Sequence, residues 1–70
     1  MQPISVQSSN VQAVQYSPAA LTLTVWFQSG GVYEYHGVAE HLYQQFLAAQ
    51  PHPWTAVGRA IKLHRFVKLA

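Results

Sequence analysis

The side chains best suited to metal binding or proton transfer in this sequence are four histidines. A zinc site needs three or four converging nitrogen, sulfur or oxygen ligands, which usually come in tight local pairs. The histidines are not spaced three or four residues apart on a common helix, and each falls in a different expected element: His36, His41, His52 and His64. No cysteine is present to complete a ligand set. The sequence therefore predicts no metal site and no cofactor.

Covalent or acid–base catalysis has equally little support. Ser8 and Ser9 lie outside any Gly-x-Ser-x-Gly elbow, and the chain has no aspartate to orient a histidine. The two carboxylates, Glu34 and Glu40, are expected on different elements, so they do not form an acid–base pair. Glu34 and His36 share one face of an expected strand, and we interpret them as a surface contact. The sequence predicts that the protein is not an enzyme and has no catalytic residues.

The remaining chemistry is that of binding. All four strong cations follow Gly58, whereas both glutamates lie in the middle of the chain, so the C-terminal part is basic. Exposed aromatic rings beside a basic groove are typical of proteins that bind single-stranded nucleic acid. The expected nucleic-acid-binding residues are Arg59, Lys62, Arg65, Lys68 and Trp26. Alternatively, the cations cover an ordinary solvated helix face, and Trp26 is buried under the N-terminal segment or in a dimer contact.

Three strands and two helices are expected to position these residues. Apolar alternation and helical spacing predict strands over 10–16, 21–28 and 32–36 and helices over 39–49 and 55–65. Pro51 and Pro53 separate the two helices, and Thr55 is the expected N-cap of the second helix. Residues 66–70 are either a frayed tail or a short added strand. The chain is thus predicted to be a single α+β domain, in which a three-stranded antiparallel β-meander packs against two C-terminal helices.

The turn between the second and third strands decides which residues face the helices. A two-residue loop would place Tyr33 and Tyr35 beside Trp26, whereas a three-residue loop over 29–31 shifts the pairing by one residue. The three-residue loop collects the larger apolar face, so it is the prediction, and it leaves Trp26 on the opposite, exposed face. The predicted inner face consists of Leu21, Leu23, Val25, Phe27, Tyr33 and Tyr35.

The charge content and the N-terminus bear on partners and location. Only 9% of the residues are charged, against roughly 25% in an ordinary soluble domain. Such a surface favours burial in an oligomer, so a homodimer or a larger protein complex is the expected alternative to an RNA partner. No stretch reaches the ~18 apolar residues of a membrane span, and no signal peptide is apparent. We expect no membrane partner and a cytoplasmic location.

The order of these motifs resembles that of the KTSC domain. This small domain is named for the C-terminus of some lysyl-tRNA synthetases and also occurs as stand-alone bacterial and phage proteins. The matching motifs are Ser8-Ser9-Asn10-Val11, Tyr16, Leu23-x-Val25-x-Phe27-x-x-Gly30 and Tyr33-x-Tyr35-x-Gly37-Val38. The hallmark of the family is the Tyr-x-Tyr at Tyr33 and Tyr35. The resemblance implies a structural role for Tyr33, Tyr35, Gly30 and Phe27, and RNA binding has been suggested for the family, whose function is otherwise unknown.

The resemblance covers residues 8 to 49 well and is weaker in the C-terminal third. Pro51-His52-Pro53-Trp54 stands where the family usually carries a Ser-x-Gly step and an aromatic residue, and Ala39 replaces a frequent proline. The leading expectation is a small non-enzymatic module that binds nucleic acid, RNA first, through its basic C-terminal helix and exposed aromatic residues. The alternative is a protein-interaction or homo-oligomerisation module without a nucleic-acid role.

Overall fold

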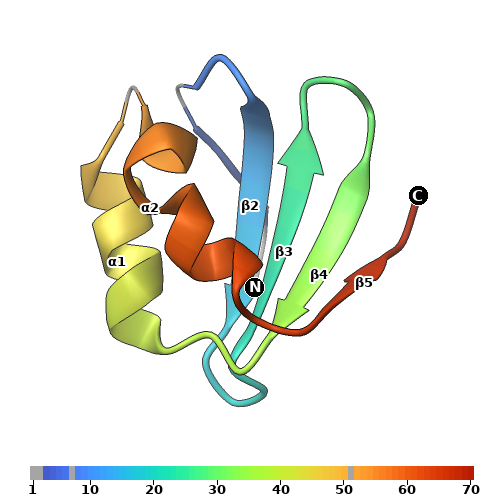
Figure 1. The fold of residues 1–70 in the computed structure, drawn as a ribbon, viewed down its shortest axis with the longest axis vertical. Helices are drawn as coiled ribbons and strands as arrows, with labels where there is room; N and C mark the ends of the chain where they lie inside the picture. The colour runs from blue at the N-terminus through green and yellow to red at the C-terminus, as the bar shows by residue number, and fades with distance from the viewer. Residues whose placement is uncertain (1–2, 7, 51) are drawn as a thin grey trace.

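The computed structural model describes residues 3–6, 8–50 and 52–70. The elements in chain order are β1 (Ile4–Ser5), β2 (Val11–Ser17), β3 (Thr22–Phe27), β4 (Val32–His36), α1 (Glu40–Ala48), α2 (Pro53–Lys62) and β5 (Phe66–Lys68). The strands form one antiparallel sheet in the order β1-β2-β3-β4-β5, and both helices lie on one side of it (Figure 1). The predicted α+β class is confirmed, with a five-stranded sheet in place of the predicted three strands. None of the helices in the described part of the chain has the length and apolarity that a membrane crossing requires.

The hairpin between β3 and β4 has the predicted length and the predicted faces. Phe27 N–H donates to the Gly31 carbonyl at 2.8 Å, so the three loop residues are 28–30 and not 29–31. Gly30 takes the left-handed backbone conformation that such a loop requires, with a φ of 101°. Because both ends of the loop move by one residue, the register shifts by two and the side chains keep their faces. Val25 therefore pairs with Tyr33, which confirms the predicted inner face in this region.

Leu21 is the exception on that face. It was expected to begin the second strand, but it lies in the turn before β3 with a φ of 51° and an exposed side chain. A left-handed residue cannot continue the alternation of the strand, so β3 begins at Thr22. The expectation that Leu21 joins the inner face is wrong.

Strand β2 contains an irregularity that explains its imperfect alternation. Its register shifts between Val11 and Ala13, which is a β-bulge at Gln12. The bulge allows Val11 and Val14, three positions apart, to point to the same face as Tyr16, and all three side chains are buried. A strict two-residue period over this strand would have turned one of these side chains to the outside.

Short strands complete the sheet on both edges. Strand β1 pairs with β2, and β5 pairs with β4 through Tyr33–Lys68 and Tyr35–Phe66. The backbone pairing continues beyond β5, since Leu69 N–H donates to the Val32 carbonyl at 2.7 Å. Of the two alternatives for the C-terminal residues, the added strand is therefore the one observed.

The second helix begins earlier than predicted. Pro53 stands in its first turn and His52 is its N-cap, so the expectation that Thr55 caps the helix is wrong. Proline is favoured at the first helical position because its missing N–H has no partner there in any case. The helix ends at Lys62, three positions before the predicted end at Arg65. Trp54 consequently lies inside α2 and not in the loop before it.

The core lies between the sheet and the helices. Its side chains, each at most 8% exposed, are Val11, Val14, Tyr16, Leu23, Val25, Tyr35, Val38, Leu42, Tyr43, Phe46 and Ile61. Two tyrosine rings stack at its centre, Tyr16 on Tyr43, with 4.8 Å between the ring centroids. The Tyr16 hydroxyl donates to the Val38 carbonyl at 2.6 Å, whereas the buried Tyr43 hydroxyl has no hydrogen-bond partner among the described residues.

Candidate functional site

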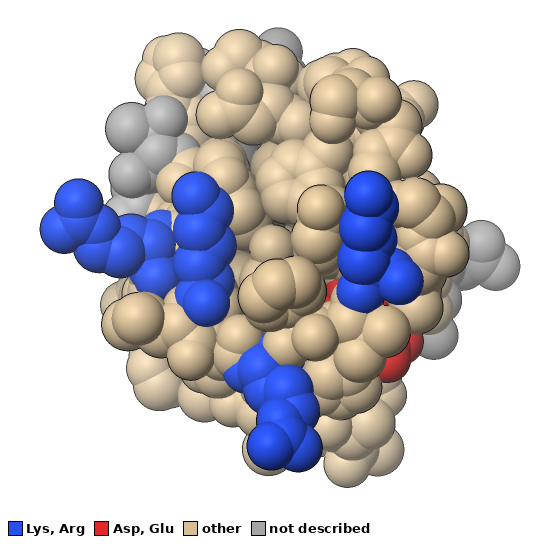
Figure 2. Space-filling view, turned by 45° about the vertical axis from the view of Figure 1, so that its right-hand side comes forward, with Lys and Arg blue, Asp and Glu red and all other residues tan. Residues whose placement is uncertain are grey.

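The four strong cations lie around one side of the molecule. Figure 2 shows the blue Lys and Arg side chains spaced about a central tan surface, with little red in view. Among the described residues, the one carboxylate that contacts a basic side chain is that of Glu34, beside His36, so no lysine or arginine is neutralised by a carboxylate at contact distance. This side of the protein is therefore available to a negatively charged ligand.

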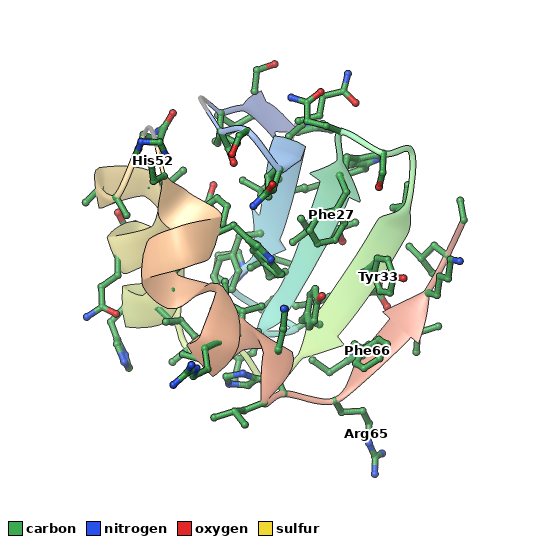
Figure 3. All side chains as sticks on the ribbon, turned by 45° about the horizontal axis from the view of Figure 1, so that its top comes forward. Phe27, Tyr33, His52, Arg65 and Phe66 are labelled. Carbon is green, nitrogen blue, oxygen red and sulfur yellow. The ribbon has the colours of Figure 1, made fainter. Side chains whose placement is uncertain are left out.

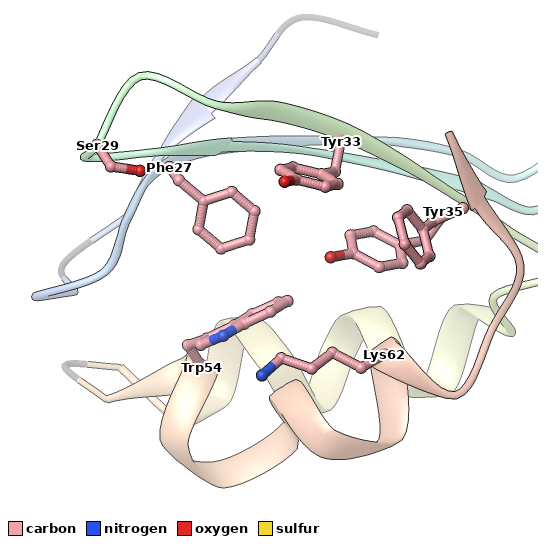
Figure 4. A pocket seen from close by; sticks show the side chains of 7 residues that line it. Phe27, Ser29, Tyr33, Tyr35, Trp54 and Lys62 are labelled. Carbon is pink, nitrogen blue, oxygen red and sulfur yellow. The ribbon is translucent and has the colours of Figure 1, made fainter. Parts of the chain in front are cut away.

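An aromatic groove opens on the same side, between α2 and strands β3, β4 and β5. Its volume is about 570 Å³, and it is lined by Phe27, Ser29, Tyr33, Tyr35, Trp54, Lys62 and Phe66. Trp54 and Lys62 come from α2, and the other side chains come from the sheet or its hairpin (Figure 4). Five of the seven lining residues are aromatic, which makes stacking the main interaction that this groove can offer.

Three neighbouring strands supply the sheet side of the groove. Phe27, Tyr33 and Phe66 follow one another across β3, β4 and β5 (Figure 3). Val25 is directly opposite Tyr33, and Tyr35 is directly opposite Phe66. Residues two apart on a strand share a face, so Phe27, Tyr33 and Phe66 all project to the same side of the sheet. Tyr33 is 5.7 Å from Phe66 and 6.3 Å from Tyr35, measured between ring centroids. The strand order thus builds a continuous aromatic wall from residues far apart in the sequence.

The helix side of the groove depends on a regular spacing of four residues. Trp54, Gly58 and Lys62 follow at that interval, so they lie along one face of α2. A Cβ atom on Gly58 would lie only 2.9 Å from Cδ2 of the Trp54 indole, so the ring rests directly on the helix backbone. Lys62 Nζ lies 5.7 Å from the Trp54 ring centroid, within range of a cation–π interaction.

The two sides meet at Phe27. Its ring is edge-on to Tyr33, with centroids 5.5 Å apart, and edge-on to Trp54 at 5.0 Å. Tyr35 is also near Trp54, at 6.2 Å, and its hydroxyl points into the groove (Figure 4). Burial raises the pKa of Tyr35, with a smaller contribution from Tyr33, so the hydroxyl stays protonated at neutral pH and can donate a hydrogen bond.

The expected nucleic-acid-binding residues do not all lie at this groove. Lys62 lines it, and Lys68 projects to the groove side of the sheet because it is directly opposite Tyr33. Arg59 is exposed on α2 one turn before Lys62, and Arg65 points away from the sheet (Figure 3). Trp26 pairs with Val32 on the opposite face of the sheet, where it is half-buried. The fold therefore separates Trp26 from the groove.

Four motif residues were expected to have a structural role. Three of them, Phe27, Tyr33 and Tyr35, also line the groove. Sequence reasoning gave no binding role to two further lining residues, Trp54 and Phe66. A predicted helix that began at Pro53 would have included Trp54. The four-residue spacing of Trp54, Gly58 and Lys62 would then have placed all three on one face of that helix. No sequence pattern predicted that Phe66 lines the groove. Its position depends on β5, a three-residue strand that is defined only by its backbone pairing with β4.

The histidines are not gathered at this groove. His36 Nε2 lies 3.2 Å from Oε1 of Glu34, which confirms the predicted surface contact between them. His64 Nδ1 lies 2.9 Å from the Ala60 carbonyl at the end of α2. Within the described residues, no three His, Asp or Glu side chains converge on a common point that could hold a metal ion.

The fold agrees with the comparisons with known proteins. The family model of the KTSC domain matches residues 7–62, and the chain belongs to the KTSC domain family. A solved relative is a KTSC domain protein from Yersinia pestis, whose crystal structure is 28% identical to this chain in sequence. The similarity covers 99% of this chain and 97% of the relative, with a TM-score of 0.89. No curated protein matches the sequence.

Proposed function

We propose that this domain binds single-stranded nucleic acid, with RNA as the first candidate, in the aromatic groove. The observation that carries the proposal is the combination of five aromatic rings in one open groove with lysines on both of its sides. Aromatic faces bind bases of any sequence, and the cations bind phosphates. Lys62 on α2 and Lys68 on β5 are suited to contact phosphates on either side of a stacked base.

The charges of the domain support a weak, phosphate-directed interaction. The net charge is only +2, but the Lys and Arg side chains lie on one side of the molecule, the side seen in Figure 2. Glu34 lies on the outer face of the sheet, and Glu40 opens α1. With at most four cations engaged, log affinity should fall against log salt with a slope no steeper than about −3. The affinity should be about micromolar or weaker at physiological salt.

Stacking is assigned to Trp54 in this proposal, although Trp26 was the ring expected from the sequence. The two indoles lie on opposite sides of the sheet, so they cannot stack on the same base. Trp54 belongs to the groove, whereas Trp26 has no cation beside it on its own strand or on β4. Trp26 therefore serves as the matched control for Trp54.

The test is binding of a labelled single-stranded RNA at low salt. Reversing Arg59 and Lys62 to Glu should abolish binding while the fold is retained, because both side chains are exposed. Trp54→Ala should weaken binding by about 1–3 kcal/mol, and Trp26→Ala should leave it unchanged. If the double charge reversal binds RNA as well as the parent does, the nucleic-acid proposal is wrong.

We also propose that the domain has no catalytic activity. Its groove presents rings, one serine hydroxyl and one lysine, which is a set suited to binding. The contact between Glu34 and His36, which pairs a carboxylate with an imidazole, lies on the outer face of the sheet. A cytoplasmic location in a bacterial or phage setting stays part of this proposal.

Self-association is a second candidate, favoured by one observation. Large apolar side chains are exposed along the segment after α2, at Leu63, Phe66, Val67 and Leu69. Strand β5 is also a sheet edge, which could pair with a second copy. Sedimentation at tens of micromolar tests this, since a mass that stays monomeric at every concentration would exclude a homodimer in that range.

A further inference from the structure

The arrangement of the rings limits how much nucleic acid the groove can hold. Tyr33 on the sheet side and Trp54 on the helix side face each other across the groove (Figure 4). Phe27 contacts both rings edge-on, which closes the groove at one end. Phe66 and Tyr35, 5.7 Å apart, stand at the other end. These rings bound the groove on both sides and at both ends.

We infer that the groove is a slot for a single unstacked base, which rests on the function proposed above. The ligand class would be the terminal or unpaired nucleotide of an RNA, and not a long run of single strand. The volume of about 570 Å³ falls within the range of roughly 300–1,000 Å³ typical of sites for one small molecule. Domains that track a strand instead contact about 4–16 nucleotides.

Gly58 sets the position of the Trp54 ring on the helix side of this slot. Any side chain at this position meets the indole within van der Waals distance, at 2.9 Å from Cδ2 and 3.1 Å from Cγ of Trp54. The ring would then have to rise from the helix toward Phe27 and Tyr35, which would narrow the slot. Gly58 is therefore a positioning residue, which acts through Trp54 and does not itself contact the base.

Charged groups are placed for the phosphate of the same nucleotide. Lys62 Nζ lies beside the Trp54 ring at 5.7 Å from its centroid. Lys68 stands across the slot, directly opposite Tyr33 in the pairing of β4 with β5. A base between the rings would have Lys62 on one side and Lys68 on the other. The site therefore offers contacts to one or two phosphates of the bound nucleotide.

The first test is a length series of oligouridylates, from the mononucleotide to a decamer. After correction for the number of binding registers, affinity should stop rising at two or three nucleotides. The salt slope should stay near −1.4, the value for two phosphate contacts on a single strand. Affinity that keeps rising with each added nucleotide would overturn the single-base slot and leave RNA binding standing. Absence of binding at every length would show that the proposed function itself is wrong.

The second test is Gly58→Ala in a Trp26→Phe background, where fluorescence reports Trp54 alone. Uridine monophosphate should quench the parent, and the substitution should weaken its binding by about 5- to 150-fold, equivalent to ~1–3 kcal/mol for one lost stack. Ala60→Ser, an exposed change on the same helix, is the matched control and should bind as the parent does. Undiminished binding by a folded Gly58→Ala variant would overturn the role of Gly58. If this variant does not fold, Trp54→Leu replaces it, with binding of uridine monophosphate measured by titration calorimetry because that chain has no tryptophan left. Undiminished binding by that variant would overturn the slot.

Discussion

The inner face of the sheet has a closed half and an open half. In the closed half, Leu23 and Val25 lie with Phe46 and Ile61 of the helices, and all four side chains are fully buried. In the open half, Phe27 and Tyr33 are only partly covered, and Trp54 stands across a groove from them. The closed half contains mostly aliphatic residues, and the open half mostly aromatic ones. The comparison indicates that the aliphatic half stabilises the fold, while the aromatic half stays accessible to a ligand.

The largest difference between the halves should appear in stability. Phe46→Ala removes a fully buried ring and should lower the free energy of unfolding by about 3–5 kcal/mol, which approaches the whole stability of so small a domain. Phe27→Ala removes a partly exposed ring beside an open groove, so the loss should be at most about 3 kcal/mol. Urea unfolding measures both values. Equal losses would mean that the groove is part of the core.

Alkaline pH should lower the stability of the fold mainly through its buried tyrosine hydroxyls. Burial raises the pKa of Tyr16, Tyr35 and Tyr43 above the usual 10.0, and Glu40 adds to the shift at Tyr16. Below pH 10 these hydroxyls are protonated in both the folded and the unfolded chain, so stability is unaffected. Above pH 10 the unfolded chain loses its protons first, and stability should fall as pH rises toward the folded-state pKa values. In a Tyr33→Phe variant, whose remaining tyrosines are these three, circular dichroism and tyrosinate absorbance should change together. Tyrosinate absorbance that rises before the variant unfolds would contradict this.

The stacked tyrosines of the closed half should respond in opposite directions to loss of the hydroxyl. Tyr16→Phe leaves the buried Val38 carbonyl without its donor and should cost about 1–3 kcal/mol. Tyr43→Phe removes a buried hydroxyl that has no partner among the described residues, so the variant should be at least as stable as the parent. Thermal melts of the two variants give the comparison. A destabilised Tyr43→Phe protein would show that its hydroxyl bonds to an ordered water.

The inward faces of β3 and β4 were predicted from the sequence in both halves, whereas the helix side and the outer edge of the groove were not. The alternation of β3 predicted the faces of the hairpin, because a slip by one residue would have exposed the whole apolar set, although the loop lies at 28–30 and not at 29–31. The groove depends on features with weak local patterns, namely the first turn of α2 and the edge strand β5. Proline was interpreted as a break at Pro53, although it is also a good first residue of a helix. Because of that interpretation, Trp54 was not predicted as a groove residue.

Binding measurements sharpen the same comparison across the two faces of the sheet. Lys62→Gln removes one cation from the groove and should weaken RNA binding several-fold, with a salt slope less steep by about 0.7. His36→Gln on the outer face should leave both the affinity and the slope unchanged. A fluorescence titration at several salt concentrations measures both. Equal effects of the two changes would remove the reason for assigning binding to the groove.

The smallest expected effect concerns Glu34 on the outer face. Its carboxylate contacts His36 at 3.2 Å, and both side chains are about one-third exposed, at 33% and 39%. Such exposed pairs stabilise proteins by about 0–1 kcal/mol, so Glu34→Gln should lower the free energy of unfolding by less than about 1 kcal/mol. The same variant removes one of the two carboxylates of the chain and so raises its net charge. If overall charge drives RNA binding, Glu34→Gln should strengthen it as much as Lys62→Gln weakens it. If the groove binds the RNA, the affinity should change little, because Glu34 lies on the other side of the sheet and its field is screened at physiological salt.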